Sequence, residues 1–214
     1  MTAPPPGSTT AVLVPVKAFA VAKGRLRGHL SDAQRARLAR HTAERVLAAA
    51  AGAQVYVACD DAGVAEWATA HGATVAWGPG LGLNGAVDQA AAEIAAAGHT
   101  RITIAHADLP SPAGLANLGH ASIGPGGHRH DGGIVLVPDR HGDGTNVISR
   151  PAAVALSAQY GAGSFARHLD AALATGLPVT VRADARLSVD IDTAADLRHP
   201  LVARLLPTLV GAAA

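Results

Sequence analysis

The chain has 214 residues, which is long enough for one large domain with a sizeable core and too short for two generous ones. Its formal net charge of +1, with only 15% charged residues, argues against a general nucleic-acid binder, which needs a broad excess of Lys and Arg. The single cysteine, Cys59, excludes an intrachain disulfide and fits a cytoplasmic protein, and the dispersed Ala and Val residues form no run that could span a membrane.

The first ten residues contain Pro, Ser and Thr without the charge or continuous apolar run of a signal peptide, which predicts a disordered leader at 1–10 and a single domain at 11–214. The apolar run Ala11 to Val16 predicts a strand, and a basic loop with Lys17, Lys23 and Arg25 follows it. Ligands bind at the carboxyl ends of strands in open α/β sheets, so these cations suggest a polyanion such as a nucleoside triphosphate. The alternative is a solvated basic surface loop.

Strands and helices alternate along the rest of the chain. Ser31 and Gln34 form a capping-box pattern that opens a helix to about Ala51. Further strands are predicted at 54–59, 73–77, 101–105, 134–137, 147–149, 178–182 and 186–189. Further helices are predicted at 64–71, from the glycine-rich loop to about 97, at 111–119, after Pro151, from Ser164 and from Ala194. This alternation predicts a three-layer α/β fold with Rossmann-like topology and a mostly parallel central sheet.

A glycine-dense loop at 78–86 leads into the alanine-rich helix that ends near residue 97. Glycine lets the backbone approach a ligand closely, and a helix N-terminus favours an anion or a nucleobase. Asn84 lies in this loop, and its amide can both donate to and accept from a base or a ribose. The alternative is that Asn84 simply caps the helix.

Three acidic residues are candidate ligands for a metal ion. Asp108 directly follows the strand at 101–105, where a carboxylate can hold Mg²⁺ against phosphates. Asp190 and Asp192 project to the same side of an extended chain and would repel each other without a cation. The alternative for Asp192 or Thr193 is a cap on the helix that opens at Ala194, and the two roles are compatible.

Two later loops have the composition of anion-binding sites. The loop at 138–146 combines glycines, basic residues and the hydroxyl of Thr145. Gly161 and Ser164 precede a predicted helix, where Ser164 serves as an anion ligand or as a simple cap. The Gly-rich segment 119–133 carries His120, His128 and His130, and its composition favours a mobile surface loop over a metal site.

Six segments, taken together and in this order, resemble the CofC/FbiD family of phospho-acid guanylyltransferases. They are PVKAFAVAKGRL, LNGA, ADLP, DGTNV, YGAGSFARH and VDIDTAADL. The resemblance implies a GT-A-like nucleotidyltransferase fold. It also implies GTP-dependent guanylylation of 2-phospho-L-lactate or phosphoenolpyruvate in the assembly of coenzyme F-420, with the product passed to a downstream transferase.

The resemblance also implies roles for individual residues. Lys17, Lys23 and Arg25 would grip the GTP phosphates, and Asn84 would lie beside the nucleoside. A Mg²⁺ cluster would be formed by Asp108, Asp190 and Asp192, and the acceptor's phosphate and carboxylate would meet Thr145, Gly161 and Ser164.

Several alternatives stay open at this point. Another nucleotidyltransferase, such as a molybdopterin guanylyltransferase or a sugar-phosphate enzyme, is the nearest rival, and a non-catalytic nucleotide-binding relative is another. The sequence does not choose among phosphoenolpyruvate, 2-phospho-L-lactate and 3-phosphoglycerate, nor between a monomer and a homodimer.

Overall fold

The computed structural model describes residues 10–119 and 133–206. The expected leader lies outside this range, except that Thr10 is already the first residue of a strand. The histidines of the 119–133 segment, His120, His128 and His130, also lie outside the described residues. Among the described helices, none is long and apolar enough to cross a lipid bilayer.

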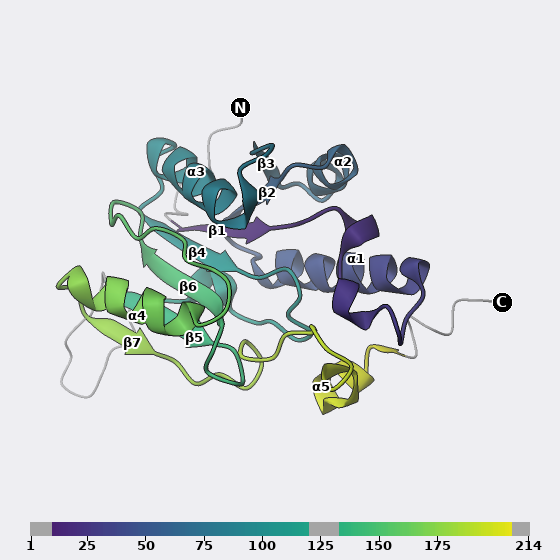
Figure 1. Ribbon diagram of the computed structural model, residues 1–214. Helices are drawn as coiled ribbons and strands as arrows, with labels where there is room; N and C mark the ends of the chain where they lie inside the picture. Colours follow the sequence, from purple (N-terminus) through teal and green to yellow (C-terminus); the bar gives the residue numbers. More distant parts are fainter. Residues whose placement is uncertain (1–9, 120–132, 207–214) are drawn as a thin grey trace.

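Within the described residues, seven strands form one mixed sheet in the order β3-β2-β1-β4-β6-β5-β7 (Figure 1). The strands are β1 (Thr10–Pro15), β2 (Gln54–Cys59), β3 (Thr74–Trp77), β4 (Arg101–Ala105), β5 (Ile134–Pro138), β6 (Thr145–Pro151) and β7 (Val179–Val181). Only β6 runs against its neighbours, pairing antiparallel with β4 and β5, so the predicted mostly parallel sheet is confirmed. Because of this reversal, β6 begins beside the carboxyl end of β4, where Val147 pairs with Ala105.

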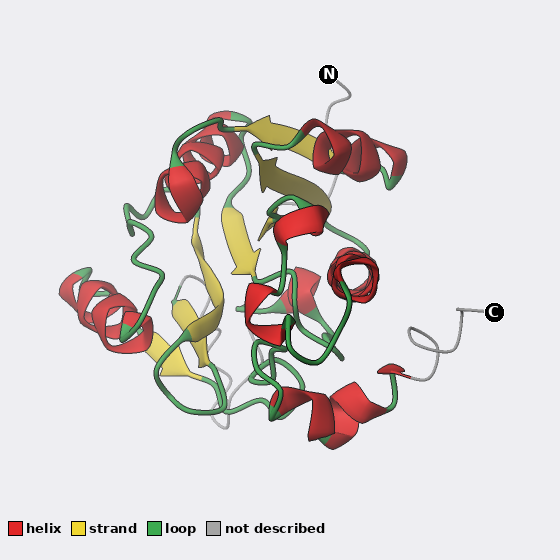
Figure 2. Cartoon of the chain, turned by 45° about the vertical axis from the view of Figure 1, so that its right-hand side comes forward, coloured by secondary structure: helices red, strands yellow, loops and turns green. Residues whose placement is uncertain are grey.

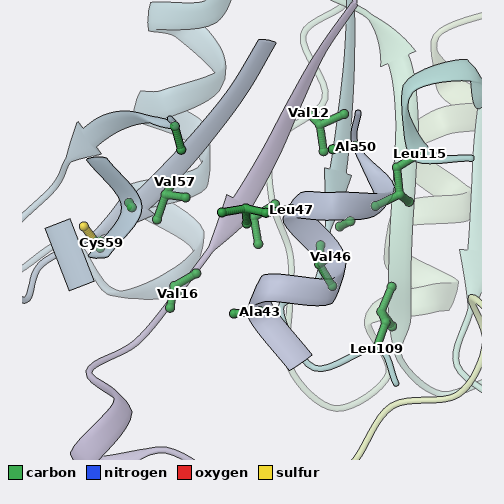
Figure 3. Packing of buried hydrophobic residues seen from close by; sticks show 14 of the residues in the cluster. Val12, Val16, Ala43, Val46, Leu47, Ala50, Val57, Cys59, Leu109 and Leu115 are labelled. Carbon is green, nitrogen blue, oxygen red and sulfur yellow. The ribbon is translucent and has the colours of Figure 1, made fainter. Parts of the chain in front are cut away.

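Helices cover both faces of the sheet, which gives the predicted three layers (Figure 2). One face packs against α1 (Asp32–Ala49) and α2 (Ala62–Ala70), and the other against α3 (Gly82–Ala96) and α4 (Ser164–Ala174). Side chains alternate across a strand, so Val12 faces the first layer and the adjacent Leu13 faces the second. Figure 3 shows Val46 and Leu47 of α1 packed against the first face.

A third buried cluster lies beyond α1 and involves the end of the chain. It joins the short 3-10 turn η2 (Gly24–Leu26) and α1 to the segment around Ile191 and to α5 (Pro200–Ala203). Leu26, Leu38, Ile191 and Val202 are its fully buried members. This cluster therefore fixes the loop after β1 against residues that lie more than 160 positions later in the chain.

Four predicted elements are wrong or shortened. The helix expected at 111–119 is reduced to the 3-10 turn η3 (Leu115–Asn117), because Gly114 before it is left-handed (φ 67°) and interrupts a helical path. No helix follows Pro151, which instead ends β6 where a missing N–H costs nothing.

The other two lie near the C-terminus. In place of the strand expected at 186–189, Asp184 accepts the amides of Arg186 and Leu187 in a turn. In place of a helix from Ala194, only the 3-10 turn η4 (Asp196–Arg198) forms before α5. In both places a short-range hydrogen bond to an aspartate competes with the regular backbone pattern.

Candidate active site

Three carboxylates that are far apart in sequence meet at one point. Asp108 follows β4, while Asp190 and Asp192 flank Ile191, and one oxygen of each lies within 4.8 Å of the others. Ile191 is buried in the same apolar cluster as Leu26, which places Asp190 and Asp192 beside the loop that carries Lys23, and Lys23 in turn bonds Asp108.

Lys23 lies among these carboxylates. Its ammonium nitrogen is 2.6 Å from Asp108 Oδ2 and 3.5 Å from Asp192 Oδ1, and it donates to the carbonyl oxygen of Ile191. Arg25 reaches Asp192 from the outside, at 3.4 Å, and is largely exposed. Lys23, which the resemblance assigns to the GTP phosphates, is thus bonded to the acidic cluster in this structure.

Asp190 and Asp108 have pKa values shifted in opposite directions. Burial and the nearby charges of Asp108 and Asp192 raise the pKa of Asp190 to about 7. Burial alone would raise the pKa of Asp108 as well, but the Lys23 ammonium and His106 hold it below its ordinary value. The cluster therefore carries more negative charge than Lys23 balances.

The donor set fits a divalent cation. All three side chains offer oxygen ligands, the type that Mg²⁺ prefers. Asp108 Oδ1 is buried and has no hydrogen-bond partner within the described structure, which leaves a lone pair free for a ligand.

A cavity of about 560 Å³ opens beside the cluster, within the range of small-molecule sites. It runs along the residues that follow β1, β2 and β4 and reaches the first turn of α3. Lys17, Lys23, Arg25, Asp108 and Asp192 line it at one end, and Cys59, Asp60, Gly78, Gly82 and Ala86 line it farther along. A ligand with an anionic end and a flat, weakly polar end would match this distribution.

Asn84 connects helix α3 to the loop that precedes α4. It lies inside the first turn of α3, so the alternative that it caps this helix is wrong. Its side chain accepts from the amide of Tyr160 at 2.8 Å and donates to the carbonyl of Tyr160 at 3.4 Å. Among the described residues, it is not one that lines the cavity.

Thr145, Gly161 and Ser164 form a second group beside the first. His168 joins its parts: Nε2 accepts from the amide of Gln159 at 2.9 Å, and Nδ1 lies 3.0 Å from Thr145 Oγ1. Ser164 donates its amide to the carbonyl of Gly161, and the helix cap is Gly163 rather than Ser164. Gly161 and Gly163 have φ of +124° and +69°, which favour glycine.

Ring contacts connect this group to the carboxylates. Tyr160 lies between His168 and His106, with ring centroids 4.9 Å apart on each side. His106 is two residues from Asp108 and lines the cavity, and its Nε2 is buried with no partner in the described structure. The group of Thr145, Gly161 and Ser164 is therefore connected to the acidic cluster through Tyr160 and His106.

The loop between β5 and β6 is not the anion cradle that its composition suggests. The amides of His141, Asp143 and Gly144 all donate to the carboxylate of Asp139. These donors are satisfied within the loop itself. Its glycines allow a tight turn around an aspartate rather than a phosphate.

Sequence reasoning assigned no role to three residues of this region: His106, His168 and Asp196. The histidines have no local signal, because their partners come from other elements. Asp196 does have a local sequence signal, since it follows Thr193 by three positions and can accept the amides of a preceding turn.

The comparisons of this chain with known proteins agree with one another on its family. Residues 10–203 match the family model described as "Guanylyl transferase CofC like". A phosphoenolpyruvate guanylyltransferase from Sphaerobacter thermophilus is 36% identical over 195 residues, covering 89% of this chain and 92% of the relative. A 2-phospho-L-lactate guanylyltransferase from Methanothermobacter thermautotrophicus is 35% identical, covering 88% and 82%.

A solved structure supports the fold. A Desulfovibrio desulfuricans protein described as a nucleotide-diphospho-sugar transferase superposes with a TM-score of 0.67 over 94% of this chain and 96% of its own. Its sequence identity of 19% limits the comparison to architecture.

Proposed function

This chain belongs to the family of CofC-like guanylyl transferases, and from that membership we propose that it transfers GMP from GTP to the phosphate of a small phospho-acid. The acceptor is phosphoenolpyruvate or 2-phospho-L-lactate, because these acids appear in the names of relatives that align over most of the chain. The enzyme is thus a nucleotidyltransferase that acts in the cytoplasm, in the assembly of coenzyme F-420, and its product passes to a downstream transferase.

One observation carries this proposal. The carboxylates of Asp108, Asp190 and Asp192 converge beside the Lys23 ammonium. They lie at the end of a cavity that is lined by the loop after β1. Nucleotidyl transfer needs this combination, since it depends on charge neutralisation and positioning more than on a reactive side chain.

The chemistry balances without an enzymic base. An oxygen of the acceptor phosphate, already an anion at neutral pH, attacks the α-phosphorus of GTP. A new P–O bond forms, the bond to the β-phosphate oxygen breaks, and pyrophosphate leaves with the electron pair. The product joins the acid to guanosine through two phosphates.

Asp108, Asp190 and Asp192 would hold Mg²⁺, which when bound neutralises phosphate charge and orients the reacting groups. Lys23 holds Asp108 and the Ile191 carbonyl in place at the rim of the cavity. Lys17 and Arg25 are exposed and line the same end, so they bind the phosphates that depart as pyrophosphate.

The second group receives the acceptor. Gly161 lies just before α4 and Ser164 begins it, at a helix N-terminus that favours an anion, and Thr145 is linked to them through His168. Asn84 acts on the nucleoside side, at the start of α3, and holds the backbone of Tyr160 next to Gly161.

The test is a direct one. The purified chain is incubated with GTP, Mg²⁺ and either phosphoenolpyruvate, 2-phospho-L-lactate or 3-phosphoglycerate, and both pyrophosphate release and product mass are measured. We expect pyrophosphate and a guanylylated acid in equal amounts with at least one acid. GTP consumption with a sugar phosphate or a pterin instead would favour the rival nucleotidyltransferases, and no consumption would favour a non-catalytic relative.

The variant Asp190→Asn tests the acidic cluster. We expect turnover to fall by more than roughly 100-fold, beyond what loss of an outer partner of a metal site costs. The matched control is Asp170→Asn, an exposed aspartate on α4, which should keep full activity. Near-normal guanylyl transfer by Asp190→Asn would remove that carboxylate from the mechanism.

A further inference from the structure

Asp196 is buried immediately behind the turn that carries Asp190 and Asp192. Its side chain is 6% exposed. Its Oδ2 accepts from the amide of Asp192 at 2.9 Å, the amide of Thr193 at 2.6 Å and the hydroxyl of Thr193 at 2.9 Å. With three donors on one oxygen, this carboxylate shapes the turn and is not itself directed at the cation site.

The other oxygen of Asp196 is held from a different part of the sheet. Oδ1 accepts from a terminal nitrogen of Arg140, in the loop between β5 and β6. Arg140 Nε donates in turn to His141 Nε2, which orients the guanidinium. A charge-assisted bond of this kind is stronger than one between neutral groups.

Four donors converge on the Asp196 carboxylate: the amides of Asp192 and Thr193, the hydroxyl of Thr193 and the guanidinium of Arg140. Only an ionised carboxylate accepts all four of these hydrogen bonds at once.

We propose that Asp196, held by Arg140, is a positioning residue that sets the turn 190–193 in the geometry needed to bind a divalent cation. The inference rests on the proposed metal site at Asp108, Asp190 and Asp192. Lys23 and Ile191 hold the turn from the cavity side, and Asp196 holds the amides of Asp192 and Thr193 from behind. Without that hold, Asp192 is free to leave the group.

The test measures metal binding without catalysis. Binding of Mn²⁺, an oxygen-preferring ion with an electron paramagnetic resonance signal, is titrated into the folded protein without substrates. We expect Asp196→Asn to weaken binding by roughly 10- to 100-fold, the usual cost of losing an outer partner. With substrates, the Mg²⁺ concentration for half-maximal rate should rise while the rate at saturating Mg²⁺ largely recovers.

Asp184→Asn is the matched control. Asp184 also accepts two backbone amides, from Arg186 and Leu187, and pairs with an arginine, Arg182, but none of its hydrogen-bond partners lies in the turn 190–193. It should leave the Mn²⁺ affinity unchanged. If both variants lose the same Mn²⁺ affinity, the cause is a general loosening of the structure, and the inference is overturned.

Arg140 provides a second variant that does not depend on Asp196→Asn folding. Arg140→Met should weaken Mn²⁺ binding in the same direction, and Arg140→Lys should restore part of it. The double variant should bind no more weakly than Asp196→Asn, because both act through one contact. If wild-type protein binds no Mn²⁺, the metal site itself fails; if wild type binds and Asp196→Asn and Arg140→Met bind equally well, only the positioning role fails.

Discussion

Single residues in this protein hold charge in places where charge is costly. Lys23 is the only non-glycine residue of the described chain with a positive φ, 57°, and its ammonium is almost fully buried among carboxylates. Backbone strain of this kind persists only when surrounding contacts require it. Here Asp108, Asp192 and the Ile191 carbonyl supply those contacts.

His168 is a buried side chain whose hydrogen bonds fix its neutral form. A backbone amide can only donate, so the Nε2 that accepts from Gln159 has no proton, and Nδ1 carries it toward Thr145. Burial, and then the charge of Arg167, lowers the pKa of His168 to about 4. A second proton would face the Gln159 N–H directly.

This predicts a pH dependence of stability. Below about pH 6.5 the unfolded chain binds a proton at His168 that the folded chain refuses until about pH 4, so the free energy of unfolding should fall as pH falls through this window. At about 1.4 kcal/mol per pH unit, the loss is about 3 kcal/mol.

Urea unfolding at pH 7 and pH 4.5 measures this loss. His168→Gln, which cannot take up a proton, should flatten the difference, whereas His29→Gln at an exposed site should not. An unchanged pH dependence in His168→Gln would show that other groups are responsible.

Between elements, side-chain bonds to backbone join segments that share no sheet pairing. Asn84 of α3 bonds the amide and the carbonyl of Tyr160, which directly precedes Gly161. Asp143 accepts the amide of Gly163 through its side chain and that of Phe165 through its carbonyl. The loop at 159–164 is therefore set by residues on both sides of it.

Asn84→Ala tests this link. We expect a loss of about 1–2 kcal/mol in unfolding free energy, since two hydrogen bonds disappear and a partly buried amide is left unpaired. The KM for the phospho-acid should rise because the Gly161 loop loosens.

Steady-state kinetics with each substrate varied in turn separates the two roles of Asn84. Gln89→Ala on the same helix, which removes a solvent-exposed hydrogen bond to the Trp77 carbonyl, is the control. A rise in the KM for GTP alone, with stability intact, would leave Asn84 with the nucleoside role only and contradict the linking role.

At the scale of the whole molecule, stability comes from two apolar layers on opposite faces of one sheet. Val12 in the central strand β1 is fully buried against α1. Val21, at the rim of the cavity, is 63% exposed. The same substitution at the two positions compares burial directly.

Val12→Ala should lower the unfolding free energy by about 2 kcal/mol, from two lost methyl groups and the cavity they leave. Val21→Ala should change it by less than about 0.5 kcal/mol. Thermal or denaturant unfolding measures both. Similar losses at the two positions would mean that the β1 face is not the stabilising core.

The sequence by itself determined the elements with strong local patterns. The alternation of apolar strands and helices and the capping box at Ser31 depend on neighbouring residues, and the structure confirms them. The elements predicted at 111–119 and 186–198 were wrong. Hydrogen bonds to aspartate side chains and the left-handed backbone of Gly114 outweigh the weak apolar periodicity there.

Only the tertiary structure decided which distant residues meet. The family resemblance implied that Asp108, Asp190 and Asp192 would meet, but no spacing in the chain encodes their contact, and folding brings one oxygen of each within 4.8 Å of the others. For the same reason the place of Lys23 among carboxylates, the link through His168 and the support of Asp196 by Arg140 could not be read from the sequence. Hydrogen bonds and ion pairs act over a few ångströms in space, whatever the number of residues between the partners.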